Sequence, residues 1–325
     1  MTSLALTRTT DPAAGFHVPV LLPEMLSALA VRPGGVYLDA TFGAGGYSRA
    51  ILAAGPGRVL ALDRDPDAVA RGHRLAAEQA RFSMLEGRFG AMAELLLAAG
   101  IRRLHGIVLD LGLSSAQLDD PARGFSFMID GPLDMRMSGQ GSTAAELVNQ
   151  ADETTLANIL YRYGEEPAAR RIARAIVERR RRAPIERTRE LARLVAAAIG
   201  RSRARIDPAT RTFQALRIQV NDELGELEQA LNSAEQLLAP GGRLIVVAFH
   251  SLEDRLVKQF LAARSGGLPR PSRHVPEPPS RPAARFRPLV RQPIRADPAE
   301  VAANPRARSA RLRAAERLPG PESLS

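Results

Sequence analysis

Short apolar runs alternate with helical patterns along much of the chain, beginning near residue 36. Strands and helices that alternate in this way form a parallel sheet with helices on both faces. We therefore predict an α/β fold built on a doubly wound parallel sheet. The apolar runs that predict its strands are residues 36–39, 59–63, 82–85, 107–110 and 243–249.

The segment between the fourth and fifth predicted strands is far too long for one crossover connection. We therefore predict an inserted α-helical domain at residues 119–219. Residues 1–118 and 220–325 would then form one discontinuous sheet domain.

Two helices are predicted inside the insertion. The first is a basic helix over residues 165–182, with Pro167 at an early position that suits proline. The second covers residues 189–199, with Thr188 as its N-cap and Gly200 as its stop signal.

A longer helix is predicted to lead back to the sheet. Apolar residues recur at steps of three and four from Phe213 to Leu238, and Pro240-Gly241-Gly242 is expected to end this helix. We expect a loop at residues 265–285, a final strand within 286–316, and disorder in the last few residues.

A glycine turn follows the first predicted strand. Gly43, Gly45 and Gly46 allow a sharp turn and a close approach of the backbone to a ligand. Asp63 ends the second strand, twenty positions after Gly43, where a carboxylate can accept hydrogen bonds from ribose hydroxyls. This arrangement predicts a nucleotide-type cofactor site.

The spacing of the motif distinguishes between cofactors. A dinucleotide fingerprint requires glycine or alanine at position 48, where this chain has Ser48, so a nicotinamide enzyme is disfavoured. An acidic residue, Asp39, stands on the strand before the turn, which favours S-adenosylmethionine, with Asp39 near its amino-acid end. The alternative is a glycine-rich turn that serves packing alone.

Composition narrows the chemistry further. The chain has no cysteine, which excludes disulfides, thiolate metal sites and methylation at C5 of a pyrimidine by way of a cysteine nucleophile. Transfer to an amine, amide or hydroxyl stays open. We see no convincing metal cluster, and no metal is predicted.

The net charge of +10 is unevenly distributed. Residues 161–217 and 255–325 each carry +10, whereas the rest of the chain carries −10. This segregation of basic residues favours a nucleic-acid partner, and ordinary solvated helix faces are the alternative. No apolar run is long enough for a membrane helix, and residues 1–16 lack the layout of a secretion signal, so we expect a cytoplasmic enzyme.

Two candidate catalytic residues follow the fourth and fifth strands. Asp110 ends the fourth strand, and His250 comes directly after the fifth. If these strands are neighbours, both side chains face one crevice. His250 either lies near the methyl acceptor or orients the turn, in which Ser251 and Asp254 fit a capping box.

Long segments of the chain resemble the ribosomal RNA small subunit methyltransferase H family, which methylates N4 of a decoding-region cytidine in 16S rRNA with S-adenosylmethionine. The resemblance runs nearly from end to end. The matching segments are HVPVLLPEML at 17–26, DATFGAGGYS at 39–48, ALDRDPDA at 61–68, LDLGLSSAQLDDPARGFSF at 109–127, GPLDMRM at 131–137, NILYRYGEE at 158–166, ATRTFQALRIQVNDEL at 209–224, APGGRLIVVAFHSLEDRLVK at 239–258 and NPRARSARLRAAE at 304–316.

The resemblance implies a Rossmann-like S-adenosylmethionine methyltransferase body, a helical insertion on the substrate side, and the small ribosomal subunit as partner. Tyr47 departs from the family, which commonly has histidine there. Phe89 either lies against the adenine or only packs the core, and Gln117 either contacts the cofactor or caps a loop. The cofactor-binding residues that the family implies are Gly45, Gly46, Tyr47, Asp63, Phe89, Asp110 and Gln117.

Asp110 is expected to bind the cofactor and to be a possible acceptor for the reacting N4 group. Phe125 and Phe127, in the loop at 124–137, either stack on a flipped-out cytosine or form a hydrophobic lid. The arginines of 170–182 are expected to contact rRNA phosphates. The alternatives are an enzyme of the same fold that acts on another amine, and a non-catalytic RNA-binding assembly factor.

Overall fold

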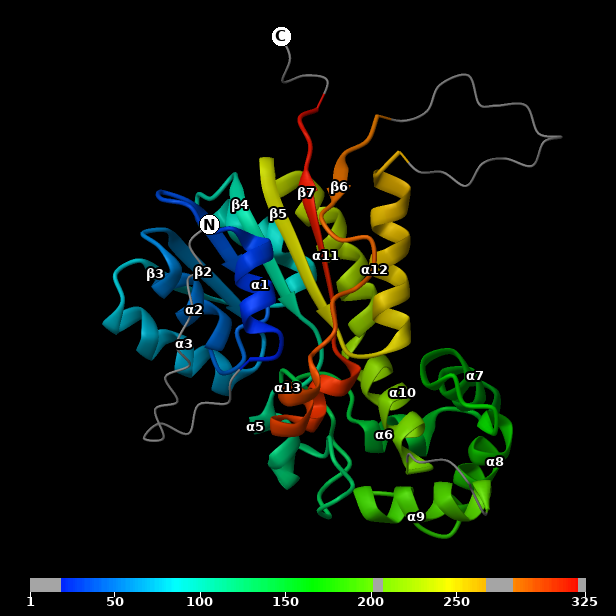
Figure 1. Ribbon diagram of the computed structural model, residues 1–325. Helices are drawn as coiled ribbons and strands as arrows, with labels where there is room; N and C mark the ends of the chain where they lie inside the picture. Colours follow the sequence, from blue (N-terminus) through cyan, green and yellow to red (C-terminus); the bar gives the residue numbers. More distant parts are fainter. Residues whose placement is uncertain (1–18, 201–206, 267–282, 321–325) are drawn as a thin grey trace, which may run out of the picture.

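The computed structural model describes residues 19–200, 207–266 and 283–320. Within them the chain forms a seven-stranded sheet of order β3-β2-β1-β4-β5-β7-β6, in which neighbours through β5 are parallel (Figure 1). The prediction of an α/β, doubly wound sheet is confirmed, and β4 and β5 are neighbours as expected. The strands are β1 (Val36–Asp39), β2 (Arg58–Asp63), β3 (Phe82–Glu86), β4 (Leu104–Asp110), β5 (Leu238–Ala248), β6 (Phe286–Pro288) and β7 (Arg311–Arg317).

The strands alternate their side chains between two apolar layers. In β2, Val59 and Ala61 pack with one layer, whereas Leu60 and Leu62 pack with the other. Strands buried on both faces are typical of parallel sheets covered by helices. One layer is completed by α1 (Leu22–Leu29), α2 (Gly46–Ala54) and α3 (Pro66–Glu78), and the other by α4 (Met92–Ala98), α11 (Glu223–Leu237) and α12 (Ser251–Arg264).

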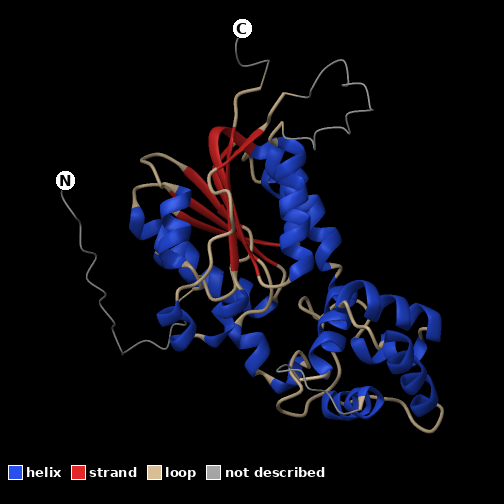
Figure 2. Cartoon of the chain, turned by 45° about the vertical axis from the view of Figure 1, so that its right-hand side comes forward, coloured by secondary structure: helices blue, strands red, loops and turns tan. Residues whose placement is uncertain are grey.

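A third apolar cluster lies in the helical segment beyond the carboxyl ends of the strands. Figure 2 shows this segment as a separate group of helices beside the sheet. The domain boundaries at 119 and 219 stay a prediction, and α10 continues two residues past the second of them. The helices are α6 (Ala144–Gln150), α7 (Glu153–Gly164), α8 (Ala169–Arg180), α9 (Thr188–Ile199) and α10 (Ala209–Asn221).

The predicted helix from Phe213 to Leu238 is wrong in one respect, because the structure has two helices there. They meet at Asp222, whose φ of 50° lies in the left-handed region. The apolar spacing continues across this break, so periodicity alone does not reveal it. The second helix ends at Leu237, and Pro240-Gly241-Gly242 falls within β5, where the pairing register with β4 shifts.

The helices of the insertion also differ from prediction at their starts. The basic helix α8 begins at Ala169, so Pro167 precedes it. The N-cap of α9 is Arg187, and Thr188 is its first residue, with a hydroxyl that accepts a hydrogen bond from the backbone nitrogen of Gly131. Gly200 ends α9 as predicted.

The final segment returns to the sheet and to the strand ends. The predicted final strand is present as β6 and β7, both antiparallel to their neighbours. Between them, α13 (Pro298–Ala303) and the 3₁₀ turn η3 (Pro305–Ser309) lie beside α5 (Ser115–Asp119) (Figure 1). The side chain of Arg306 joins these segments, donating to Ser115 at 2.5 Å and to Asp119 at 2.8 Å.

The expectations for residues 1–16, for most of the loop at 265–285 and for the last five residues fall outside the described residues. Among the helices that the structure describes, none has the length and hydrophobicity that a membrane crossing requires.

Candidate active site

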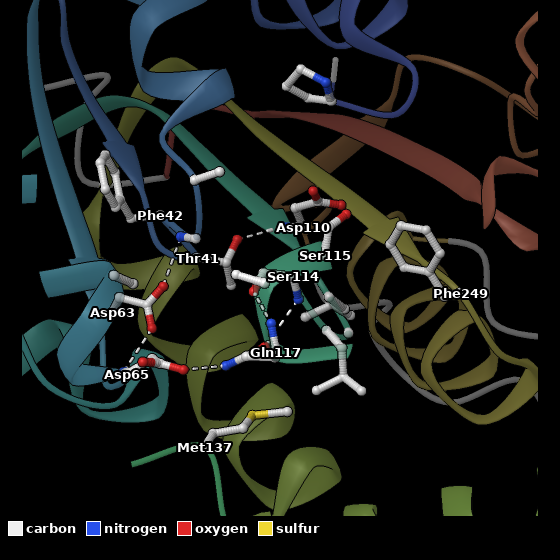
Figure 3. A pocket seen from close by; sticks show the side chains of 18 of the residues that line it. Thr41, Phe42, Asp63, Asp65, Asp110, Ser114, Ser115, Gln117, Met137 and Phe249 are labelled. Carbon is white, nitrogen blue, oxygen red and sulfur yellow. Dashed lines mark hydrogen bonds between the residues drawn. The ribbon is translucent and has the colours of Figure 1, made fainter. Parts of the chain in front are cut away.

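The carboxyl ends of β1, β2, β4 and β5 surround a cavity of about 410 Å³. Loops after all four strands, the start of α11 and the turn η3 contribute to its wall. Figure 3 shows Asp63 and Asp65 on one side of the cavity and Asp110 and Phe249 on the other. Ligands of doubly wound sheets bind in this position, where strand order reverses.

The glycine turn is shaped by close contacts. A Cβ at Gly45 would lie 2.6 Å from the ring of Phe42, and one at Gly46 would lie 2.2 Å from Cγ of Pro19. Gly45 also has a φ of 80°, which favours glycine. Gly46 lines the cavity, whereas Gly45 is not among the described residues of its lining and serves the turn itself.

Asp63 supports this turn from the end of β2. Its Oδ2 accepts a 2.8 Å hydrogen bond from the nitrogen of Gly43, and its Oδ1 accepts one of 2.9 Å from the nitrogen of Asp65. Burial raises the pKa of Asp63 above the usual value. A carboxylate has about four acceptor positions, so Asp63 can still accept from a diol in the cavity.

Asp39 lies deeper than the sequence indicated. Its side chain is fully buried and accepts a 2.7 Å hydrogen bond from the hydroxyl of Ser48. Burial raises its pKa to about 6. Asp39 is not among the described residues that line the cavity, so it stabilises the start of α2 instead of facing a ligand.

Tyr47 and Phe89 are both part of the cavity wall and of the core. The hydroxyl of Tyr47 donates to the carbonyl of Val20, so it is directed away from a polar ligand. Phe89 begins the 3₁₀ turn η1 (Phe89–Ala91) after β3 and packs, half-buried, against the apolar layer beneath the cavity. Its ring can therefore be both a packing residue and an apolar wall.

Asp110 has a buried oxygen without a partner. Its backbone nitrogen donates to the hydroxyl of Thr41 at 2.7 Å, but its Oδ1 makes no hydrogen bond with any described residue. Burial, and then the nearby acids Asp39 and Glu253, raise the pKa of Asp110 well above the usual value. An unpartnered carboxyl in a cavity is suited to a ligand that is cationic or donates hydrogen bonds.

Gln117 has both of the roles that were considered from the sequence, since it caps a helix and faces the cavity. It completes a capping box with Ser114 at the start of α5, and its Nε2 donates a 2.6 Å hydrogen bond to Asp65. Burial opposes the ionisation of Asp65, but hydrogen bonds from Arg123 and Gln117 outweigh it and lower the pKa of Asp65. Gln117 therefore caps a helix and lines the cavity at once.

His250 does not face the cavity as expected. The cavity lining after β5 is provided by Phe249 and Glu253. His250 is the N-cap of α12 and forms a capping box with Glu253, so the box predicted for Ser251 and Asp254 is wrong. The geometry favours the turn-orienting interpretation of His250.

Sequence reasoning missed a group of charged residues on the wall. Arg217, Glu223 and Glu253 all line the cavity. Leu216, Val220 and Leu227 define an apolar helix face, and Arg217 and Glu223 fall on it. Charged residues on such a face were the one sequence feature that could have indicated this group. The side chains of Glu223, His250 and Glu253 each offer an atom that could bind a metal, and these atoms lie within 4.8 Å of one another. The carboxylate of Glu223 is already paired with the positively charged guanidinium of Arg217, which disfavours a metal ion there.

The loop that carries Phe125 and Phe127 packs its two rings into the helical segment. Phe125 is buried in the apolar cluster of the helical segment, and Phe127 packs edge-on against Phe213 with ring centroids 4.8 Å apart. Both rings are therefore engaged within the protein. The alternative of stacking on a base is not supported by this arrangement.

Comparison with known proteins supports a close relationship over nearly the whole chain. A protein of Paramagnetospirillum magneticum named ribosomal RNA small subunit methyltransferase H is 63% identical over 307 residues, which is 94% of this chain and 96% of that protein. A protein of the same name from Rhodospirillum centenum is 60% identical, covering 95% and 94% of the two chains. Likeness to solved structures is weaker: a putative rRNA-methylase from Clostridium thermocellum matches at 13% identity with a TM-score of 0.42, covering 93% of this chain and 100% of that one.

The sequence model of the MraW methylase family matches residues 14–318, a range that includes the glycine turn, Asp63, Asp110 and the polar wall after β5. The chain therefore belongs to the MraW methylase family.

Proposed function

We propose that this protein is an S-adenosylmethionine-dependent rRNA methyltransferase that methylates N4 of a cytidine in the decoding region of 16S rRNA. The names of its relatives support small-subunit rRNA as the substrate. The observation that carries the chemistry is the unpartnered carboxyl of Asp110, which shares one cavity with the glycine turn and Asp63.

The residues of the cavity fit S-adenosylmethionine. Asp63 offers acceptor positions for the ribose hydroxyls, and the free oxygen of Asp110 suits the cationic amino-acid and sulfonium end. The half-buried ring of Phe89 offers an apolar surface for the adenine. When bound, this cofactor supplies an electrophilic methyl group on a positively charged sulfur.

The chain's own residues have to position a weak nucleophile. The N4 lone pair of cytosine is delocalised into the ring, so N4 must be held in line with the sulfur–methyl bond. In the transfer, the N4–methyl bond forms, the sulfur–methyl bond breaks with its electron pair on sulfur, and N4 loses one proton. Asp110 accepts the hydrogen bond from N4 and is the nearest base for that proton, because burial makes it more basic than an exposed aspartate.

The helical segment offers a basic surface for the RNA. Among the described residues, the side chains of Arg170, Arg181 and Arg182 make no hydrogen bond or ion pair, and all three are exposed. Arg180 differs, because it donates to two backbone carbonyls of the neighbouring α6 region and stabilises the fold instead. We infer that the exposed arginines bind phosphates of the small subunit, and that the enzyme acts in the cytoplasm.

Labelled S-adenosylmethionine tests the proposal directly. The enzyme is supplied with unmodified small subunits, with naked 16S rRNA or with no RNA, and the modified base is mapped by mass spectrometry. We expect one N4-methylcytidine in the decoding region. Label transfer without RNA would indicate another amine as acceptor, and RNA binding without any transfer would indicate an assembly factor; either outcome overturns the proposal.

A further inference from the structure

A buried ion pair on the cavity wall has no role in the chemistry described so far. Arg217 lies in the C-terminal half of α10, and its guanidinium donates from Nε and Nη2 to the two carboxylate oxygens of Glu223 at 2.7 and 2.8 Å. Glu223 is the first residue of α11. Only 16% of the Arg217 side chain and 7% of the Glu223 side chain are exposed.

Stability alone is a weak reason for such a pair. Removing two charges from water costs several kcal/mol, and buried ion pairs can often be replaced by apolar residues without loss of stability. The junction that presents the pair is also strained, because Asp222 has a φ of 50°. Gly225 leaves room for the Asp222 carboxylate, since a Cβ there would lie 2.6 Å from its oxygens.

The pair lines the same cavity as Asp110, to which the proposed function assigns the methyl transfer. Carboxylate oxygens of Glu253 and Glu223 lie within 4.8 Å of each other, so Glu253 lies beside Arg217, and the charge of Glu253 also acts on Asp110. Glu253 lines this cavity as well. A planar ligand that places its reacting atom at Asp110 therefore has Arg217 within the same pocket.

Arg217 retains hydrogen-bond donors that the protein does not use. A guanidinium has five N–H groups, and Glu223 takes two of them. No described residue accepts from the others. Glu223 fixes the plane of the guanidinium, so the free N–H groups are oriented in advance.

We propose that Arg217 recognises the acceptor base by donating hydrogen bonds to N3 and O2 of the cytosine, and that Glu223 is a positioning residue that holds Arg217 for this contact. The inference rests on the proposed function, because it assumes a cytosine in the cavity. The contact would orient the cytosine and would also distinguish cytosine from uracil. Cytosine has a lone pair at N3, whereas uracil has an N–H there, which would oppose the guanidinium.

The test combines a protein variant with a change to single atoms of the RNA. Wild-type enzyme and Arg217→Met are assayed on small subunits whose target residue is either cytidine or 3-deazacytidine, which keeps the N4 amine but has C–H at position 3. Arg217→Lys tests the fork geometry, since lysine keeps the charge but not the paired donors. Arg88→Met is the matched control. Arg88 forms a 2.9 Å ion pair with Glu226, which lies in α11 as Glu223 does, but Arg88 does not line the cavity.

We expect wild-type kcat/KM to fall roughly tenfold to a hundredfold on the 3-deazacytidine substrate. Arg217→Met should lose a similar factor on cytidine, and it should lose nothing further on 3-deazacytidine. S-adenosylmethionine affinity should stay within about twofold of wild type in both Arg217 variants. The Arg88→Met control should keep the wild-type response to both substrates.

Two results would overturn the inference. One is an equal kcat/KM of the wild-type enzyme on cytidine and 3-deazacytidine substrates. This measurement does not require any variant to fold. The other is an Arg217→Met enzyme in which the 3-deazacytidine penalty persists in full, because the arginine would then act only through the fold. Failure of the proposed function is distinguishable, since wild-type enzyme would then produce no N4-methylcytidine at all.

Discussion

The carboxylate of Asp63 accepts a 2.8 Å hydrogen bond from the backbone nitrogen of Gly43, and this bond joins the end of β2 to the glycine turn after β1. One side chain thus shapes the turn and offers acceptor positions to a ligand. We expect Asp63→Ala to weaken S-adenosylmethionine binding by roughly tenfold to a hundredfold, as loss of charged hydrogen bonds predicts. Calorimetric titration measures this. Asp67→Ala is the control, because 74% of the Asp67 side chain is exposed, and an equal loss there would refute the assignment.

Asp110 should couple cofactor binding to proton release. Burial and the neighbouring acids Asp39 and Glu253 raise its pKa well above the ordinary value, so the free enzyme holds this proton to a higher pH than an exposed aspartate does. A bound cation favours the ionised form and lowers that pKa, so binding releases a proton and tightens as pH rises toward the raised value.

Calorimetry in buffers of different ionisation enthalpy measures the protons released by Asp110. We expect the Asp110→Asn variant to release none and to bind the cofactor more weakly, with turnover greatly reduced. Wild-type enzyme that releases no more protons than Asp110→Asn at any pH measured would contradict the assignment.

Asp39 should reduce stability at neutral pH. Its folded pKa of about 6 lies above the ordinary value of 3.8, so the folded state binds the proton more tightly than the unfolded state. The contribution is therefore favourable below about pH 4 and is lost as pH rises toward 6, a difference of about 3 kcal/mol at most. Asp39→Asn should be more stable than wild type at pH 7.5, with little difference at pH 4.

Urea unfolding at the two pH values checks the prediction for Asp39. Ser48→Ala is the converse variant, because it removes the hydroxyl that stabilises the ionised carboxylate. It should be less stable than wild type at pH 7.5. If Asp39→Asn is destabilised equally at both pH values, the buried charge is not the source of the effect.

Glu165 joins the helical segment to the sheet domain from a strained position. It follows α7 with a φ of 48°, and its carboxylate accepts hydrogen bonds from Ser251 at 2.6 Å and Arg255 at 2.7 Å. Alanine and glycine both remove these contacts, but only glycine tolerates the backbone angle without cost. Glu165→Gly should therefore be about 1 kcal/mol more stable than Glu165→Ala in urea unfolding. Equal stability would show that position 165 carries no backbone strain.

The exposed arginines of α8 and the following turn should determine how RNA binding depends on salt. Replacing Arg170, Arg181 and Arg182 together by glutamine should reduce the slope of log affinity against log salt by about 2 to 3, because each lost phosphate contact contributes roughly 0.7–0.9. Arg180→Gln should lower stability and leave the slope unchanged. An unchanged slope in the triple variant would remove these residues from the RNA interface.

The sequence predicted the parts of the site that depend on short-range pattern. Apolar runs located the parallel strands to within a few residues, and because the carboxyl ends of such strands meet, Asp63 and Asp110 were expected in one cavity. The glycine turn was predictable for the same reason, since a sharp turn between strand and helix excludes most side chains. These features follow from local chemistry.

The sequence could not predict features that depend on tertiary packing. The break at Asp222 is hidden because the apolar repeat continues through it, and a left-handed aspartate has no distinctive local signal. The depth of Asp39 and the position of His250 outside the cavity lining are also set by tertiary packing. Arg217 was visible only as a charge on an apolar helix face, which does not by itself indicate its partner.

The cavity draws its wall from both extremes of the described chain, because Pro19 lies against Gly46, and Asn304, Arg306 and Ser309 also line the cavity. A nascent polypeptide folds from its N-terminal side as synthesis proceeds. The glycine turn would therefore exist well before the pocket is enclosed. An unfinished enzyme emerging from a ribosome should not sequester cofactor, so competence to act on ribosomal RNA would begin only after translation has passed residue 309.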